Sequence, residues 1–245
     1  MHGAQGLVAM DAIPAQDLQA GARRLARPST AVGARAPLTV LITGFGPFPG
    51  APFNPTGAVV AALVRRRRPA LTGLRMIGHV FRTSYEAVDA ELPELVARHR
   101  PHVLLMFGLA ARTRYLRIET RARNRRSLLF ADVAGHLPDV AAIRPGAEAT
   151  RRGRAPFARL LTAARATRAP ARLSSDAGRY LCNYAYRRAL ELEPVLPGVV
   201  FIHVPKVRRS PMIRRPGRQR AVTAADLVRA GEAILLGLVA GVRRR

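Results

Sequence analysis

The stretch Leu-Thr-Val-Leu-Ile-Thr-Gly-Phe-Gly-Pro-Phe, residues 38–48, carries the clearest signal of fold in this chain. Its first part, 38–43, is a short and nearly continuous apolar run that stops at a glycine, which is typical of a strand buried on both faces of a sheet. A Gly/Pro-rich turn follows, and 56–67 then has the composition of a helix. A buried strand that leads through a turn into a helix is the repeating unit of α/β proteins.

The same alternation continues along the chain. Ser84 is placed to cap one helix, and Thr223 with Asp226 forms a Thr-x-x-Asp start typical of a capping box. Residues 115–122 alternate weakly, which indicates a further strand, whereas 127–153 is expected to be loop. The other expected strands are 74–80, 103–107 and 199–204, and the other expected helices are 84–98, 157–166, 179–192 and one that begins at Thr223. We therefore expect a single-domain α/β fold over 38–245, a three-layer α/β/α sandwich around a mixed, largely parallel sheet.

Residues 1–37 are rich in Ala, Gly, Arg and Pro and show little periodicity, so we expect a disordered N-terminal extension. A targeting leader is the alternative, but Asp11, Asp17 and a second start at Met10 favour the extension. No secretory signal is expected, and every apolar run falls far short of the roughly 20 residues that span a bilayer. The single cysteine cannot form an internal disulfide. The expected compartment is the cytoplasm.

The formal net charge of +26 raises nucleic acid and anionic membranes as partners. The basic residues are almost all arginine, with Lys206 as the only lysine, and they are scattered along the whole chain. No aromatic-interleaved platform or nucleic-acid-binding motif accompanies them. This pattern favours a general compositional bias, so we expect neither a membrane nor nucleic acid as a partner.

Cys182 is the only cysteine, and an isolated cysteine is usually a small buried apolar residue. Its surroundings favour a chemical role, because Gly178 allows a tight turn and the residues after it have a helical pattern. Unpaired N–H groups and the helix dipole stabilise a thiolate at a helix N-terminus, and the same N–H groups can bind an oxyanion. Cys182 is therefore the candidate nucleophile.

A thiolate that attacks an amide needs a proton donor for the departing amine and a group that holds this donor in place. His203 is the best placed of the six histidines, because it lies near the end of the expected strand 199–204, where α/β folds present residues to a ligand crevice. Glu119 stands alone in an arginine-rich stretch that favours its ionised form. The alternatives are a core histidine bonded to the backbone and a surface ion-pairing glutamate.

These residues lie in blocks that resemble, in the same order, the pyroglutamyl peptidase type I (pyrrolidone-carboxylate peptidase) family. The resemblance runs from residue 38 to about 205. The blocks are Thr43-Gly44-Phe45-Gly46-Pro47-Phe48, Asn54-Pro55-Thr56, Gly108-Leu109-Ala110 leading to Ile118-Glu119, Ala122 and Asn124, Ala177-Gly178 to Cys182-Asn183, and Phe201-Ile202-His203-Val204-Pro205.

The resemblance implies a cysteine peptidase that hydrolyses the amide bond after an N-terminal pyroglutamyl residue. Cys182 would be the nucleophile and His203 the acid and base, and Glu119 would orient His203 or anchor the substrate. Phe45 and Phe48 would line the pocket for the lactam ring, because a small, flat, uncharged ring suits an aromatic slot; core packing is the alternative for both. The implied partners are peptides with an N-terminal pyroglutamate, and the family's habit of self-association implies a homo-oligomer.

No cofactor or metal is expected, because Cys182 has no cysteine companion and no histidines show zinc-ligand spacing. The chain departs from the family at Ala111-Arg112-Thr113, where members have a second glycine and an arginine, and in 125–139, which keeps only Pro138-Asp139 of the usual loop. These departures indicate a divergent member. A related thiol hydrolase acting on another small lactam or amide is the alternative, and a non-enzymatic nucleic-acid-binding protein is a third reading.

Overall fold

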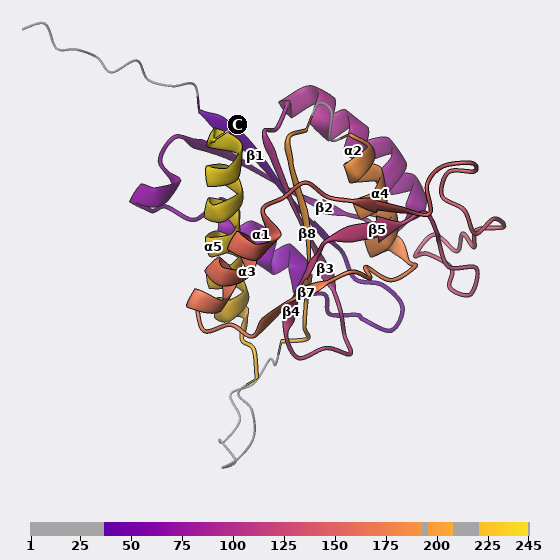
Figure 1. Cartoon of the computed structure of the whole chain (residues 1–245). Coiled ribbons are helices and arrows are strands. Elements are labelled where there is room, and N and C mark those ends of the chain that lie inside the picture. Colours follow the sequence, from indigo (N-terminus) through magenta and orange to yellow (C-terminus); the bar gives the residue numbers. More distant parts are fainter. Residues whose placement is uncertain (1–36, 193–195, 208–220, 245) are drawn as a thin grey trace, which may run out of the picture. The chain divides into compact units, whose positions relative to one another are not determined.

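The computed structural model describes residues 37–192, 196–207 and 221–244, so the expected extension lies outside the described residues except for Pro37. A six-stranded sheet and a two-stranded sheet organise this part of the chain (Figure 1). The strands of the large sheet are β1 (Leu38–Phe45), β2 (Leu74–Phe81), β3 (Val103–Leu109), β4 (Leu116–Glu119), β7 (Ala171–Ser174) and β8 (Gly198–Val204). The small sheet pairs β5 (Arg121–Arg123) with β6 (Thr150–Arg152).

The large sheet has the strand order β2-β1-β3-β8-β4-β7. The strands β2, β1, β3 and β8 are parallel, whereas β4 runs antiparallel to β8 and parallel to β7. The expected mixed and largely parallel sheet is confirmed. Every residue of β3 and β8 is buried, because these central strands are covered on both faces.

Helices cover both faces of this sheet and complete the three layers (Figure 1). One apolar cluster joins the sheet to α1, α3 and α5, and a second joins it to α2 and α4. The helices are α1 (Thr56–Val64), α2 (Tyr85–His99), α3 (Phe157–Ala166), α4 (Leu181–Glu191) and α5 (Ala224–Arg243), and a 3-10 turn, η1, spans Pro69–Leu71.

Both predicted helix caps are confirmed. The Ser84 hydroxyl accepts a hydrogen bond from the backbone N–H of Ala87 at the start of α2, at 3.3 Å. At the start of α5, the Thr223 hydroxyl accepts from the Asp226 N–H at 3.1 Å, and the Asp226 carboxylate accepts from the Thr223 N–H at 2.9 Å. These bonds satisfy N–H groups that have no partner within the helix.

Three predictions of local structure were wrong. The helix expected over 56–67 ends at Val64. The strand expected over 115–122 is interrupted at Thr120, because β4 ends at Glu119 in the large sheet and β5 begins at Arg121 and pairs with β6 in the small sheet. Residues 127–153 contain the short strand β6, and β7 was not predicted at all. Both strands are short and partly exposed, so pairing with a neighbour creates them without apolar alternation in the sequence.

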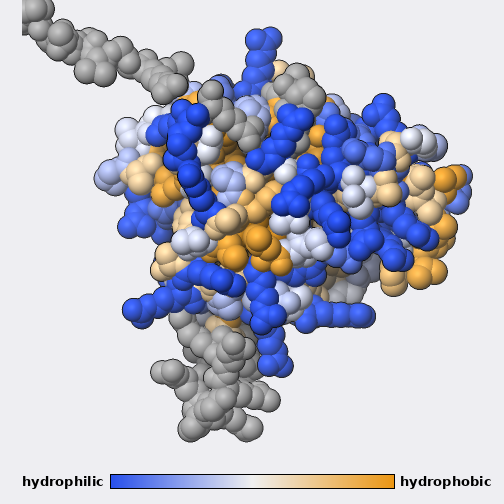
Figure 2. Space-filling view, viewed as in Figure 1, coloured by the Kyte–Doolittle hydropathy of each residue, from blue (hydrophilic) through white to orange (hydrophobic). Residues whose placement is uncertain are grey.

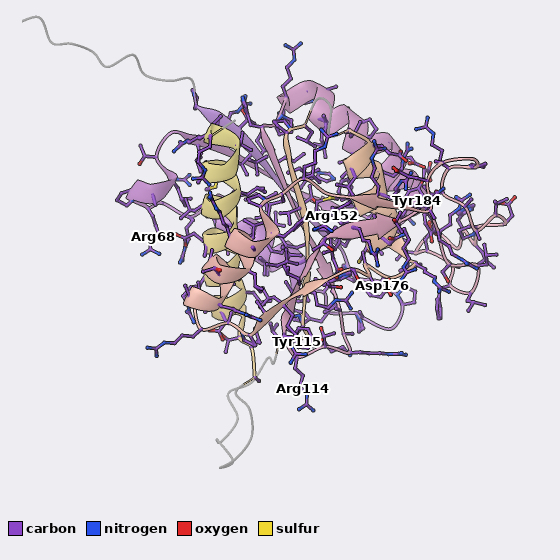
Figure 3. All side chains as sticks on the ribbon, in the orientation of Figure 1. Arg68, Arg114, Tyr115, Arg152, Asp176 and Tyr184 are labelled. Carbon is purple, nitrogen blue, oxygen red and sulfur yellow. The ribbon has the colours of Figure 1, made fainter. Side chains whose placement is uncertain are left out.

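Arginine side chains are spread over the surface of the described residues. Figure 3 labels three exposed examples, Arg68, Arg114 and Arg152, which lie on separate parts of the molecule. No helix among the described residues is long and apolar enough to cross a membrane.

Candidate active site

Three neighbouring strands bring candidate residues into one row. In the register of the sheet, Gly108 of β3 lies opposite His203 of β8, and His203 lies opposite Arg117 of β4. Residues that lie opposite one another in paired strands point to the same face. The row therefore faces the side of the sheet that α2 and α4 cover, because Phe201, two residues before His203, belongs to the apolar cluster on that side.

Glu119 joins this row from the diagonal position. It lies opposite Phe201, so it is a diagonal neighbour of His203 and within reach of it. The Oε1 atom of Glu119 lies 2.7 Å from Nδ1 of His203. Arg117 donates to the same oxygen through Nε at 2.9 Å and Nη2 at 2.8 Å. Glu119 has no exposed surface, so its interpretation as a surface ion-pairing residue was wrong.

Cys182 lies in the first turn of α4 and approaches His203, close enough for its thiolate to raise the pKa of the ring. Gly108 makes this approach possible. A Cβ atom at Gly108 would lie 2.6 Å from Sγ of Cys182 and 2.7 Å from Cζ of Phe201. The thiol is partly exposed, whereas His203 and Glu119 are buried. The arrangement therefore presents one reactive group to solvent and keeps its two partners inside.

The first turn of α4 also offers backbone donors. The first intrahelical bond runs from the Tyr184 N–H to the Tyr180 carbonyl at 3.0 Å, and no side chain caps the helix. The N–H groups of residues 181–183 precede that bond and have no partner within the helix. These groups belong to the same turn as Cys182, so they are suited to stabilise a negative charge on sulfur or on an oxygen bonded to the attacked carbon.

The surroundings of His203 favour its protonated form. Burial lowers the pKa of the ring, whereas the Cys182 thiolate and the Glu119 carboxylate raise it, and the resulting pKa is about 9 against an ordinary value of 6.5. The imidazole is therefore charged at neutral pH and lies between two acidic groups. This pairing suits a ring that must hold a proton ready for a leaving group.

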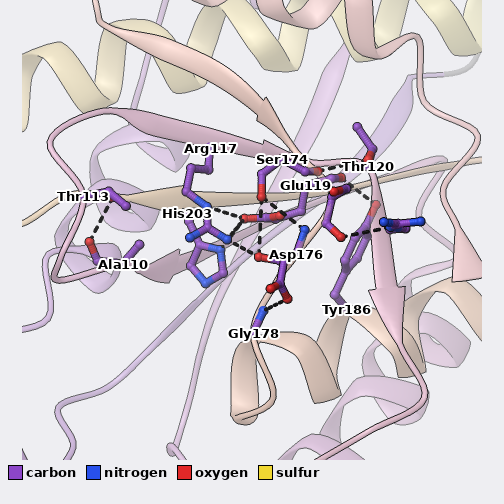
Figure 4. A network of polar contacts seen from close by, with 12 residues as sticks. Ala110, Thr113, Arg117, Glu119, Thr120, Ser174, Asp176, Gly178, Tyr186 and His203 are labelled. Atoms are coloured by element: carbon purple, nitrogen blue, oxygen red, sulfur yellow. Dashed lines mark hydrogen bonds and ion pairs between the residues drawn. The ribbon is translucent and has the colours of Figure 1, made fainter. Parts of the chain in front are cut away.

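A polar network fixes the turn that leads into α4 (Figure 4). Gly178 has a φ of 83°, a left-handed conformation that favours glycine, and its N–H donates to Asp176 Oδ1 at 3.0 Å. Arg117 donates to the Asp176 carbonyl and Arg123 pairs with the Asp176 carboxylate. Burial raises the pKa of Asp176, but the Gly178 N–H and Arg123 outweigh it and the pKa is lowered. Arg117 thus connects Glu119 to the turn before Cys182.

Asn183 ties the other side of α4 to the chain beyond β4. Its fully buried side chain accepts from the Arg123 N–H at 2.8 Å and donates to the carbonyls of Arg123 and Arg125 at 3.0 and 2.8 Å. The residue that follows Cys182 therefore positions the start of the 125–149 segment.

The two phenylalanines predicted to line the pocket differ in burial. Phe45 is only 3% exposed and packs against Phe81, with ring centroids 5.7 Å apart, so core packing accounts for its position. Phe48 is partly exposed, and its ring lies 6.3 Å from that of Tyr180. Because Tyr180 is two residues before Cys182, Phe48 lies beside the turn that carries the thiol, whereas Phe45 belongs to the apolar core.

The predicted Cys182, His203 and Glu119 are thus brought together. The sequence did not predict the contacts of Arg117 or the space that Gly108 leaves for the thiol. The one signal for Arg117 is its spacing of two from Glu119, which places both side chains on the same face of a strand. No group of three or more His, Cys, Asp or Glu side chains within 37–192, 196–207 and 221–244 could hold a metal ion.

Known proteins share this sequence and fold. The model of the pyroglutamyl peptidase family matches residues 38–230. A pyrrolidone-carboxylate peptidase from Cupriavidus necator is 32% identical over 216 residues, covering 84% of this chain and 97% of its own, and one from Thermococcus kodakarensis is 28% identical over 205 residues, covering 82% and 96%.

Two solved structures show the same fold. The pyrrolidone carboxyl peptidase from Thermococcus litoralis has a TM-score of 0.75 at 23% identity, covering 84% of this chain and 96% of its own. Pyroglutamyl peptidase I from Bacillus amyloliquefaciens has a TM-score of 0.72 at 22% identity, covering 83% and 97%.

Proposed function

This chain belongs to the pyroglutamyl peptidase family, and on that premise we propose that it removes pyroglutamate from the N-terminus of peptides with Cys182 as nucleophile. His203 serves as acid and base, and Glu119 orients His203 and supports its positive charge. The observation that carries the proposal is the position of His203, which lies opposite Gly108, the residue that the Cys182 thiol packs against, and 2.7 Å from the Glu119 carboxylate.

The reaction proceeds in two halves. The Cys182 thiolate attacks the pyroglutamyl carbonyl carbon, and the N–H groups at the start of α4 stabilise the oxyanion that forms. The carbon–nitrogen bond breaks as the His203 imidazolium gives its proton to the departing amine. The neutral ring then takes a proton from water, and the water oxygen attacks the thioester carbon. The carbon–sulfur bond breaks, which releases pyroglutamate and restores the Cys182 thiolate beside the His203 imidazolium.

The lactam ring is proposed to lie against Phe48, above Phe45. Phe48 and Tyr180 form an aromatic wall beside the thiol, and an uncharged ring can enter such a slot without the desolvation cost that a charged N-terminus would incur. Of the two alternatives for Phe45, its burial supports an indirect role that shapes the slot rather than direct contact with the ring.

The biological setting belongs to the same proposal. The partners are peptides with an N-terminal pyroglutamate, and the arginines serve no nucleic acid. A thiol nucleophile stays reduced in the cytoplasm, which is the proposed location. A homo-oligomer is proposed as the working form.

The test is release of a fluorescent amine from its pyroglutamyl amide. We expect the protein to release the amine, Cys182→Ser and alkylated protein to lose activity, and the prolyl amide, which lacks the lactam oxygen, to be inert. Retention of activity in Cys182→Ser would contradict the proposal. Cleavage of a different small amide, with the pyroglutamyl amide left intact, would favour the related thiol hydrolase instead.

A further inference from the structure

An exposed apolar segment lies beside the proposed active site. Leu128, Leu129 and Phe130 are 42%, 82% and 64% exposed. Figure 2 shows apolar surface, in orange, among hydrophilic residues at the edge where the segment after β5 lies in Figure 1. Consecutive large apolar side chains that remain open to water usually mark a binding surface.

These three residues line a pocket of about 440 Å³, a volume within the range typical of ligand sites. The other residues that line it are 125–127, which follow β5, Ala141, and the pair Arg179 and Tyr180 just before α4. Because Tyr180 is two residues before Cys182, the pocket begins next to the thiol.

Hydrogen bonds hold the pocket in place relative to α4. The Tyr180 hydroxyl donates to the Ala131 carbonyl at 2.8 Å, and Asn183 holds the Arg125 carbonyl at 2.8 Å. The N–H of Arg126 donates to the Ala141 carbonyl, also at 2.8 Å. Anchors on both sides of Cys182 therefore fix the pocket walls to the same turn that carries the thiol.

The polar part of the pocket is positively charged. Arg125, Arg126 and Arg179 line it, and no carboxylate in the described part of the chain forms an ion pair with any of the three. The Arg126 guanidinium donates to the Val140 carbonyl at 2.9 Å. Guanidinium groups that have no carboxylate partner and lie next to an apolar floor suit a ligand with apolar side chains and a carboxylate, which can accept two parallel hydrogen bonds from one arginine.

We propose that this pocket binds the leaving part of the substrate, with one or two apolar residues on Leu128, Leu129 and Phe130 and a following carboxylate at the arginines. The proposal rests on the function proposed above. A pyroglutamyl residue has nothing before it, so additional peptide can extend only on the leaving side. The pocket includes neither Phe45 nor Phe48, which leaves the slot for the ring separate.

The experiment compares kcat/KM for two tetrapeptide amides, pyroglutamyl-Leu-Phe-Glu amide and pyroglutamyl-Ser-Ser-Lys amide. We expect the first to be preferred by about tenfold or more, mainly through a lower KM. A third peptide, pyroglutamyl-Leu-Phe with a free carboxyl end, shows whether a terminal carboxylate replaces the glutamate side chain. Absence of cleavage of all three would contradict the proposed function itself, whereas cleavage of all at equal kcat/KM would overturn only the pocket assignment.

Two variants assign the preference to the pocket. Leu129→Ser should reduce the ratio of the two kcat/KM values about tenfold. Arg125→Gln should reduce the same ratio about threefold at low salt, and at high salt, where charges are screened, the variant and the wild type should show the same ratio. Both side chains are exposed, so folding should persist. The matched controls are Leu137→Ser, half exposed in the same segment but outside the pocket, and Arg159→Gln, exposed on α3. Controls that change the ratio as much as the pocket variants would overturn the assignment.

A second copy of this chain is the competing occupant. Sedimentation of the wild type and of Leu129→Ser distinguishes it. If Leu129→Ser lowers the oligomeric mass and leaves the peptide ratio unchanged, the surface is an interface between copies and the proposal fails. We expect the ratio to change and the mass to stay the same.

Discussion

His203 lies at the centre of the account at the scale of single residues. Its imidazole lies between a partly exposed thiol and a buried carboxylate, and these two groups outweigh burial in setting its pKa. The same two contacts explain why the ring holds the proton that the leaving amine needs.

The charge of His203 predicts the pH dependence of the reaction. The pKa of the ring is raised to about 9, so the imidazolium is present below that pH and is lost as the pH rises through it. We therefore expect kcat/KM for the pyroglutamyl amide to fall above about pH 9. Glu119→Gln removes one of the groups that raise the pKa, so the fall should move to lower pH by about one unit. A fall at the same pH in both proteins would contradict the role of Glu119.

A substitution at Gly108 tests the position of the Cys182 thiol through steric overlap, without any change of charge. In Gly108→Ala the new methyl group would overlap Sγ of Cys182 and the Phe201 ring, so the thiol must move. We expect kcat/KM to fall about a hundredfold, since a displacement of about 1 Å can cost that much. The control is Gly57→Ala, whose Cβ would find Val80 Cγ2 at an ordinary 3.7 Å. Full activity in Gly108→Ala, with thermal unfolding measured for both variants, would show that the thiol lies elsewhere.

The sequence predicts much of the site at this scale, but not the contacts that depend on register. Cys182 is identified by its place before a helix, and His203 by its place at a strand end. The roles of Gly108 and Arg117 could not be predicted, because they depend on which residue of β3 and β4 lies opposite His203. Strand register is set by the packed sheet and by β4 running antiparallel, and no single segment specifies either.

At the scale of elements, the turn between β7 and α4 is the part that positions the nucleophile. Arg117 and Arg121 both donate to backbone carbonyls of this turn, at Asp176 and Ser175. Only Arg117 also contacts Glu119. We therefore assign Arg117 as a positioning residue that joins β4 to the start of α4.

Comparison of Arg117→Met with Arg121→Met tests this role. Arg117→Met should lower kcat about tenfold and slow alkylation of Cys182, whereas Arg121→Met should change kcat by about twofold at most. Loss of the Arg117 positive charge should also raise the pKa of His203. The fall of kcat/KM at alkaline pH should therefore move to higher pH, which is opposite to the effect of Glu119→Gln. Equal kcat losses in both variants, with an unmoved pH profile, would mean that Arg117 only anchors the turn.

The elements that could be predicted are those with a strong pattern of their own. Apolar runs predict β1, β3 and β8, and side-chain caps predict the starts of α2 and α5. The strands β6 and β7 escaped prediction because they lie in partly exposed segments and form by pairing with β5 and β4. The loop expected over 127–153 is otherwise correct, but its anchoring by Asn183 and Tyr180 could not be predicted from composition.

At the scale of the whole described part of the chain, the two faces of the large sheet differ: one face carries the proposed catalytic residues and the other is covered by an apolar core. The face covered by α1, α3 and α5 is packed almost entirely with apolar side chains, and the proposed catalytic residues lie on the face covered by α2 and α4. A fold of this kind can change its loops beside α4 without disturbing the opposite layer. The divergence of 125–139 is therefore expected to alter substrate preference and leave the reaction type intact.

The central claim is that Cys182 carries the pyroglutamyl group during the reaction. The most direct measurement is the intact mass of the protein, quenched in acid while it turns over an activated pyroglutamyl aryl ester, whose acylation step should be faster than hydrolysis. The account predicts one added pyroglutamyl group on the peptide that contains Cys182, and none on Cys182→Ala. Turnover with no adduct, or an adduct on another residue, would contradict it.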